Sequence, residues 1–347
     1  MKREHSYKLN IERGFVELAH GSGGRAMAQL IDDIFVNAFD NELLNQKEDN
    51  ASFNVAEGRM VLATDSHVIS PLFFPGGDIG SLSVHGTIND VAMSGAVPRY
   101  LTSSFILEEG FPLKDLQRIA DSMAAAAKAA NVSIITGDTK VVEKGKGDGV
   151  FINTTGLGTI PTGINISTRR VKAGDKILVS GTMGDHGITI LSIRKDLDFH
   201  STLQSDSAAL HDLISTMVNA IPDKIHCLRD PTRGGLSATL NEIAKQADVG
   251  MHINDDAIPI KEEVRAACEL LGLEPLHIAN EGKVVVFCDA DAAKDLLGIM
   301  RSHPLGKDAA IIGEVTEDPH NFVEVETAFG GKRILDWISG EQLPRIC

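Results

Sequence analysis

Hydrophobic positions in the first half of the chain alternate between helical and strand-like spacing. Between Gly24 and Leu44 apolar side chains recur every three or four residues, which predicts an amphipathic helix. A second apolar stripe begins after Pro112 and predicts a helix that runs to Ala130. Short runs rich in β-branched residues predict strands at residues 60–64, 100–107, 132–136 and 150–160.

The second half of the chain shows the same mixture. Strand character is found at residues 176–180, 283–288, 309–315 and 322–326, and helices are predicted at 186–195, 207–220, 235–247, 260–271 and 291–302. The stretch PTGINISTRRVKAGDK, which starts at Pro161, has the composition of a connector. We therefore predict two domains of mixed α/β or α+β character, at residues 1–163 and 164–340, and a mobile tail at residues 341–347.

Composition and charge exclude two kinds of partner. The 33 basic and 48 acidic residues give a formal net charge of −15, which would repel nucleic-acid phosphates and an anionic membrane surface. No apolar run approaches the roughly 20 residues of a membrane span, and the polar start does not resemble a secretory signal. We predict a cytoplasmic protein that binds neither nucleic acid nor membrane.

The four cysteines do not follow the spacing of a zinc or CxxC redox motif. Cys268 and Cys288 lie among apolar neighbours and are interpreted as buried, inert thiols, which agrees with a reducing compartment. Cys347, at the end of the tail EQLPRIC, is different because its segment offers no core to pack into. It is either a stray thiol or a reactive thiol on a flexible arm.

Four acidic motifs are the strongest candidates for a functional site. Each is predicted to place an aspartate where a strand gives way to a loop: TDSHV with Asp65, INDVAMSGA with Asp90, TGDTK with Asp138, and RDPTRGGL with Asp230. Carboxylates in such positions form the oxygen-rich sites that Mg²⁺ prefers when it also binds substrate phosphates. Taken singly, each motif is equally typical of a turn or a helix cap, but the four together predict a magnesium site.

The segment GSGGR before the first predicted helix adds a candidate phosphate contact. Its glycines, Gly21, Gly23 and Gly24, would allow an anion to approach the helix N-terminus closely. The segment is not a P-loop, because no GxxxxGK[ST] pattern is present. Alone it could equally be a flexible entry to the helix. Beside four acidic motifs it is interpreted as a loop that shields phosphates.

The motifs HGSGG, TDSHV, NDVAMSGA, TGDTKV, RDPTRGG and NEGK, in this order, resemble those of a known ATP-dependent superfamily. It contains aminoimidazole ribonucleotide synthetase, selenophosphate synthetase and thiamine-monophosphate kinase. The final PRIC narrows the resemblance to the HypE family, the carbamoyl dehydratases of hydrogenase maturation, over about residues 14–347. The resemblance implies an N-terminal domain whose four-stranded sheet pairs with its copy into an eight-stranded barrel across a homodimer. It also implies a C-terminal α+β domain that covers a cleft for ATP and Mg²⁺.

The resemblance further implies a reaction and its residues. In the HypE family the terminal cysteine receives a carbamoyl group from the carbamoyltransferase HypF. ATP-dependent dehydration then gives a thiocyanate, and the cyanide passes to iron on the HypC–HypD complex, for the [NiFe]-hydrogenase. Cys347 matches that cysteine, Glu281 matches a proton acceptor, and Lys140 would bind developing charge or relay the proton. Cofactor contacts are expected from the loop glycines and from Asp65, Asn89, Gly137 and Thr139.

Two other functions remain as alternatives. The chain could be a selenophosphate synthetase-like enzyme or a small-molecule kinase, but selenophosphate synthetases carry a reactive Cys or Sec in the glycine loop, and GSGGR has neither. It could also be a non-catalytic scaffold that donates its tail to a partner. The complete set of acidic motifs argues against a scaffold, and ATP turnover would distinguish the two.

Overall fold

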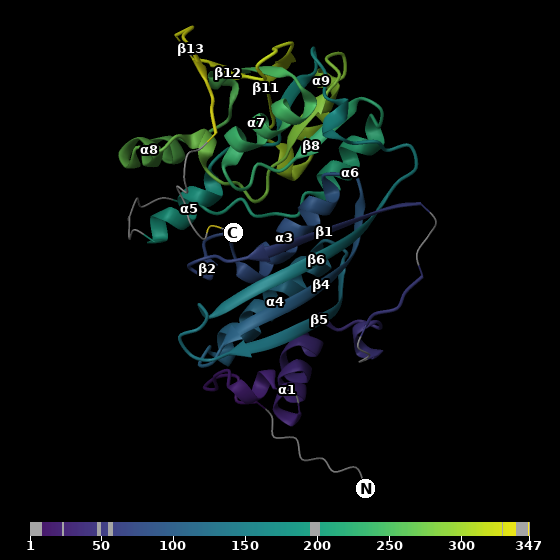
Figure 1. Cartoon of the computed structure of the whole chain (residues 1–347), viewed down its shortest axis with the longest axis vertical. Coiled ribbons are helices and arrows are strands. Elements are labelled where there is room, and N and C mark those ends of the chain that lie inside the picture. The colour runs from purple at the N-terminus through teal and green to yellow at the C-terminus, as the bar shows by residue number, and fades with distance from the viewer. Residues whose placement is uncertain are drawn as a thin grey trace.

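The chain folds into two halves, each built on its own sheet (Figure 1). The computed structural model describes residues 9–22, 24–46, 50–54, 58–194, 202–327 and 329–337, together with Ile346. The first half lies below the second in Figure 1, and the described end of the chain returns to the junction between them. The mixed two-domain α/β fold predicted from the sequence is confirmed.

The first half contains the four-stranded sheet that the resemblance implied. The strand order is β1 (Arg59–His67), β6 (Val150–Ile160), β4 (Val97–Glu108) and β5 (Ser133–Val142). Neighbouring strands are antiparallel except for β4 and β5, which are parallel. One row of the register runs across the whole sheet, from Asp65 to Thr154, Ser103 and Gly137. β1 and β5 are therefore opposite edges.

Two helices, α3 (Ile79–Ala92) and α4 (Leu113–Ala129), cover one face of this sheet. The predicted apolar stripe of α4 is confirmed, because Leu113, Leu116, Ile119, Ala120 and Met123 are all buried. α3 was not predicted. It starts at Asp78, whose carboxylate accepts hydrogen bonds from the N–H groups of Gly80 and Ser81. Most of its residues are buried, so it carries no one-sided stripe for periodicity to detect.

Three of the four acidic motifs are placed differently from the prediction. Asp65 lies inside β1, Asp90 inside α3, and Asp138 inside β5, rather than where strands give way to loops. The short apolar run at 132–136 reveals only the start of β5, since the polar residues that follow continue the ladder beside β4. Only Asp230 directly follows a strand, β8 (Ile225–Arg229).

The first helical segment is shorter than predicted. It consists of α1 (Arg25–Leu30), a π-helical turn η2 (Ile31–Val36) and α2 (Asn37–Phe39), and the chain leaves the helix at Asp40 rather than at Leu44. The side chain of Asn41 donates a hydrogen bond to the Ile134 carbonyl at 2.9 Å. This contact with β5 favours a turn over another helical turn.

The second half is built on a seven-stranded sheet with helices on both faces. The strand order is β13 (Lys332–Ile334), β12 (Val323–Glu326), β9 (Gly250–Asn254), β11 (Ala310–Thr316), β7 (Lys176–Val179), β10 (Val285–Cys288) and β8. The helices are α5 (Asp185–Arg194), α6 (His211–Ala220), α7 (Gly235–Ala247), α8 (Glu262–Leu271) and α9 (Ala293–Ser302), which confirms the five predicted. The strands β8, β9 and β13 were not predicted.

Alternation along the central strands divides the second core into two layers. Ile177, Val179 and Phe287 pack in one cluster with residues of α7. Leu178, Val286 and Cys288 pack in another with residues of α6 and α9. A continuous apolar run such as VVVFC is thus buried on both faces.

The two halves are connected between residues 160 and 176, which contain the predicted domain boundary at 163; that boundary remains a prediction. None of the helices in the described ranges is long and apolar enough to cross a membrane.

Candidate active site

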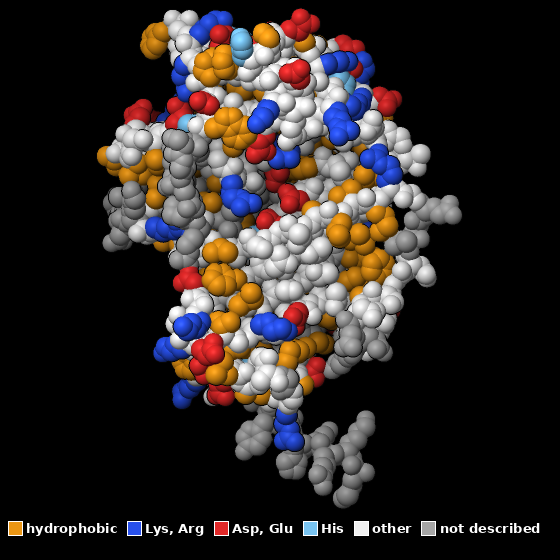
Figure 2. All heavy atoms as spheres, in the orientation of Figure 1, with side chains coloured by type: hydrophobic (Ala, Val, Ile, Leu, Met, Phe, Trp, Pro, Cys, Tyr) orange, Lys and Arg blue, Asp and Glu red, His pale blue; other side chains and the backbone are white. Residues whose placement is uncertain are grey.

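Three of the predicted acids converge where the two halves meet. Asp65 projects from β1 toward α3, where an atom added at Gly86 would lie 3.5 Å from its Oδ2. The Nε2 of buried His67, two residues further along β1, lies 3.8 Å from the same oxygen. Asp90 comes from the last turn of α3, and Asp230 follows β8 of the second half. Figure 2 shows acidic and basic side chains gathered at this junction.

The electrostatics of these acids favour the binding of a cation. Burial, together with the charges of Asp230 and Asp65, raises the pKa of Asp90 to about 7. Burial and the charge of Asp65 likewise raise the pKa of Asp230 to about 6. Arg229 acts against both shifts. A cluster in which carboxylates raise one another's pKa favours a divalent cation, and oxygen ligands suit Mg²⁺.

Glu281 lies deepest in this site. Its side chain is buried, and its Oε1 has no hydrogen-bond partner among the residues that the structure describes. Burial raises the pKa of Glu281 well above its usual value, and the negative charges of Asp206, Asp230, Asp65 and Asp90 raise it further. A raised pKa makes the Glu281 carboxylate a stronger base, which is what proton abstraction by a general base requires.

Asn89 has a structural position that its motif did not predict. Its amide donates hydrogen bonds to the carbonyls of Ala208 and Glu281, at 3.0 and 3.3 Å, and accepts one from the N–H of Leu210 at 2.8 Å. The side chain therefore ties α3 to two segments of the second half. A cofactor could use the Asn89 amide only by replacing one of these bonds.

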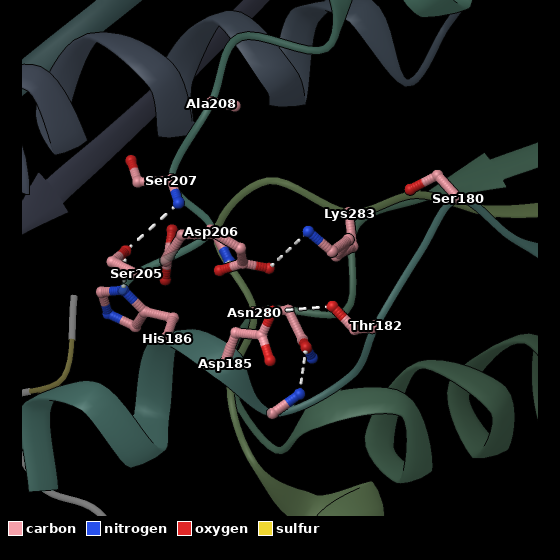
Figure 3. Close-up of polar contacts among 12 residues, drawn as sticks. Ser180, Thr182, Asp185, His186, Ser205, Asp206, Ser207, Ala208, Asn280 and Lys283 are labelled. Atoms are coloured by element: carbon pink, nitrogen blue, oxygen red, sulfur yellow. Dashed lines mark hydrogen bonds and ion pairs between the residues drawn. The ribbon is translucent and has the colours of Figure 1, made fainter. Parts of the chain in front are cut away.

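The segment around Asp206 carries polar groups that the sequence analysis missed (Figure 3). Asp206 accepts a hydrogen bond from the N–H of Glu281, and its Oδ2 lies 3.3 Å from the Nζ of Lys283. Lys283 was visible in the motif NEGK without a role. Asp206 follows a region with no motif, so only its acidity and its position between two predicted helices could have drawn attention to it.

The NEGK segment is held from both sides. The side chain of Asn280 accepts a hydrogen bond from the N–H of Gly184 at 2.7 Å and donates one to the Pro231 carbonyl at 2.9 Å. The first bond leads to the start of α5 and the second to the loop that carries Asp230. The backbone on both sides of Glu281 is thereby fixed relative to the acidic cluster.

Asp138 and Lys140 do not join this cluster within one chain. They lie on β5, at the edge opposite β1, and alternation along the strand directs them to the face away from α3 and α4. The Lys140 Nζ lies 2.7 Å from the Asp138 Oδ2, and this contact holds the pKa of Asp138 below its usual value. The four acids therefore do not form one magnesium site in a single chain.

The start of the glycine-rich loop lies against β5, the strand that carries Asp138, rather than beside the acidic cluster. An atom added at Gly21 would come within 2.6 Å of the backbone nitrogen of Val141 on β5, so only glycine allows this approach. Gly24 has φ of +85° immediately before α1. Gly23 lies outside the described residues.

Gly137 and Thr139 of β5 line a cavity of about 170 Å³ together with Asp138 and apolar residues of the first helical segment. Gly137 itself is required by strand packing, because an added Cβ would lie 2.2 Å from the Ser103 carbonyl oxygen. Two groups of predicted residues therefore occupy separate places. One surrounds Asp90 and Glu281, and the other surrounds Asp138.

The three cysteines within the described residues are buried, as the sequence predicted for structural thiols. Cys227, Cys268 and Cys288 are buried, and burial raises their pKa values to about 12, 11 and 12. Thiols with such pKa values are poor nucleophiles. Cys347 lies outside the described residues, as does the rest of the predicted tail except Ile346, which is buried.

Comparison with known proteins identifies relatives over almost the whole chain. Residues 47–160 match the model for the N-terminal domain of AIR synthase related proteins, and residues 172–326 match the C-terminal domain. The carbamoyl dehydratase HypE of Azotobacter vinelandii is 62% identical over 340 residues, which are 98% of this chain and 99% of that protein.

Solved structures agree with these sequence matches. A hydrogenase maturation protein HypE in complex with ATP is 48% identical and superimposes with a TM-score of 0.92, over 95% of this chain and 99% of that one. A chain of a HypE–HypF complex is 50% identical, with a TM-score of 0.79 over 89% of this chain and 99% of that one.

Proposed function

The chain belongs to the HypE carbamoyl dehydratases within the AIR-synthase-related proteins, and on that premise we propose that it uses ATP to dehydrate a carbamoyl group on Cys347. One observation carries the proposal. A buried carboxyl group with a raised pKa, Glu281, lies beside an acidic cluster suited to a nucleotide-bound cation. A kinase also needs an acidic cluster for a nucleotide-bound cation, but it does not need an additional base of high pKa to remove N–H protons.

The reaction requires two proton transfers. When the carbamoyl oxygen attacks the γ-phosphate of ATP, ADP leaves and the nitrogen loses one proton. Loss of phosphate then breaks the C–O bond, the nitrogen loses its second proton, and S–C≡N remains on the cysteine. Glu281 is proposed to accept one of these protons, because its raised pKa makes it a stronger base and its Oε1 has no other hydrogen-bond partner among the described residues.

Asp65, Asp90 and Asp230 are proposed to hold magnesium. Their mutual effect on pKa supports the assignment, since a bound cation would remove the repulsion among them. Magnesium would neutralise phosphate charge in this position. The positive charge of Lys283, which faces Asp206, is available near the same phosphates.

A second copy of this chain, paired with the first as a homodimer, is proposed to complete the site. The face of the first sheet away from α3 and α4 exposes Leu62, at 70%, as well as Met60 and Ile106, and Figure 2 presents it as a largely uncharged surface. Pairing two such faces would form the eight-stranded barrel of a homodimer and bury these side chains. Asp138 and Lys140 lie on that same face. They are proposed to serve the partner's acidic cluster rather than their own.

The proposed partners follow from the same chemistry. A HypF-type carbamoyltransferase supplies the carbamoyl group, which agrees with the solved HypE–HypF complex of a relative. A HypC–HypD-type iron carrier accepts the cyanide. We place the reaction in the cytoplasm, where a free thiol such as that of Cys347 stays reduced.

Intact-mass spectrometry tests the proposed function. Incubation with the carbamoyltransferase, carbamoyl phosphate and ATP should add about 43 Da to Cys347 and then remove about 18 Da as water, so that wild type ends with a net gain of about 25 Da. Glu281→Gln should keep the gain and lose the second step. A label on Cys227, Cys268 or Cys288, or no loss of water from the carbamoylated wild type, would refute the proposal.

A further inference from the structure

His186, in the first turn of α5, contacts the C-terminal tail. Its ring is fully buried and has a partner at each nitrogen. The Nδ1 lies 2.7 Å from the hydroxyl of Ser205, and the Nε2 lies 2.8 Å from the carbonyl oxygen of Ile346. Phe74 packs edge-on against the ring, with centroids 5.7 Å apart. Figure 3 shows His186 turned toward Ser205.

The two partners of the His186 ring define which nitrogen carries the proton. The Ile346 carbonyl oxygen can only accept a hydrogen bond, so the Nε2 that faces it carries the hydrogen. The Ser205 hydroxyl can donate to Nδ1 while its oxygen accepts the N–H of Ser207 at 3.1 Å. Burial lowers the pKa of His186, which favours the neutral form of the ring. A neutral ring that accepts at Nδ1 carries its hydrogen on Nε2. The ring is therefore a donor directed at the Ile346 carbonyl.

The side chain of Ile346 adds an apolar contact to this bond. It is buried in one cluster with Phe74, Ile190 of α5 and Ala279. Ala279 accepts a backbone hydrogen bond from Gly187 and lies two residues before Glu281. Ile346 thus belongs to the same apolar cluster as Ala279, two residues before the proposed base.

We propose that His186, supported by Ser205, is a positioning residue that docks the penultimate residue of the tail for the dehydration step. The inference rests on the proposed function. Cys347 must first reach the carbamoyltransferase to receive the carbamoyl group, and it must then carry that group to the ATP site. The Ile346 carbonyl is adjacent to Cys347 in the sequence, so a donor that holds it restricts where the sulfur can lie. Recognition of a backbone carbonyl and an aliphatic side chain defines a short peptide-binding subsite.

The test separates the two steps. Wild type, His186→Ala and His186→Gln are incubated with the carbamoyltransferase, carbamoyl phosphate and ATP, and the gain of the carbamoyl group and the later loss of water are each followed over time by intact mass. His186→Ala should slow the loss of water at least about fivefold, as loss of one hydrogen bond predicts, with carbamoylation and ATP affinity unchanged. His186→Gln keeps an N–H donor and should recover most of the rate. His211→Ala, which removes a histidine of α6, is the matched control.

Alkylation of Cys347 by iodoacetamide supplies a readout that does not require the proposed reaction. In the uncarbamoylated protein, His186→Ala should increase the alkylation rate of Cys347 by at least about threefold, because the docked tail is released. If wild type is not dehydrated but this increase occurs, docking stands and the proposed function fails. If His186→Ala dehydrates at the wild-type rate, or loses ATP affinity in parallel, the docking role is wrong.

A variant in the tail covers the case in which changes at His186 prevent folding. Ile346→Asp places a charge in the apolar cluster while leaving the buried ring in place. It should slow dehydration more than Ile346→Val does, with carbamoylation retained. Equal rates for Ile346→Asp and wild type would contradict the subsite.

Discussion

The Asp206 carboxylate accepts a hydrogen bond from the backbone N–H of Glu281 at 3.0 Å, across 75 positions of sequence. The same carboxylate raises the pKa of the Glu281 side chain, second only to burial. Asp206 therefore holds the backbone of Glu281 and makes its carboxyl group more basic. These two effects can be separated by mutation.

Asp206→Asn should shift the pH dependence of dehydration. The asparagine oxygen can still accept the Glu281 N–H, but the negative charge is gone, so the pKa of Glu281 falls toward its usual value. A base must be deprotonated to act, so the acid limb of the pH–rate profile should move to lower pH. The profile is measured on carbamoylated protein by intact mass at saturating ATP.

Asp212→Asn is the control for this shift, because Asp212 is an exposed acid on α6 whose contact is with His303. An acid limb that stays in place in Asp206→Asn would contradict the electrostatic role assigned to Asp206. A shift of equal size in Asp212→Asn would assign the effect to net charge rather than to position.

Subunit mixing should test whether Asp138 acts across a dimer. Asp230→Asn and Asp138→Asn should each reduce magnesium-dependent ATP hydrolysis by more than about tenfold. If each site takes Asp230 from one chain and Asp138 from the other, a mixed dimer keeps one intact site. An equal mixture should then recover about a quarter of wild-type activity. A mixture as inactive as its components, after exchange has been confirmed, would place both residues in one chain's site.

The sequence predicted which acidic residues lie together better than it predicted the elements that carry them. Asp65, Asp90, Asp230 and Glu281 do converge, although they come from a strand, a helix and two loops. Their motifs were recognisable because residue type and order survive without knowledge of the fold. α3 escaped detection because a helix buried on several sides has no polar face.

The position of Asp138 escaped prediction for another reason. Alternation along β5 assigns its side chain to a face of the sheet, but the extent of β5 was hidden by its polar second half. Asp206 and His186 belong to no motif, and their roles depend on contacts with residues far away in the sequence. Such contacts depend on the packing of the two halves, which local patterns do not encode.

Leu62→Glu should weaken the proposed dimer. The Leu62 side chain projects from the uncovered face of β1 and is 70% exposed in the single chain. A charge there would be buried without a partner if two sheets pair. Sedimentation at micromolar concentration should show a monomer, against a dimer for wild type. Leu270→Glu, at an equally exposed leucine of α8, should remain a dimer. If Leu62→Glu dimerises as strongly as wild type, this face is not the interface.

His85 should make the protein less stable in mild acid. It lies in α3, and its Nδ1 contacts the Ser207 hydroxyl at 3.0 Å, between the two halves. Burial, and then repulsion from His211, lowers the pKa of His85 to about 4. An unfolded chain binds a proton at this residue near pH 6.5, whereas the folded chain does so only near pH 4. The contribution of His85 to stability is therefore complete above pH 6.5 and is lost as the pH falls toward 4, by at most about 3 kcal/mol.

His85→Asn should remove this pH dependence, because asparagine does not titrate and can still contact Ser207. The thermal midpoints of wild type and His85→Asn are compared at pH 7.5 and pH 5. The thermal midpoint of wild type should fall further between pH 7.5 and pH 5 than that of the variant, whatever the two midpoints are at pH 7.5. His320→Asn, at the end of a surface turn, should behave like wild type at both pH values. If the thermal midpoints of His85→Asn and wild type fall equally between pH 7.5 and pH 5, then His85 has an ordinary pKa in the folded chain. The junction between the halves would in that case be open to water at α3, contrary to the burial from which the pKa of His85 follows.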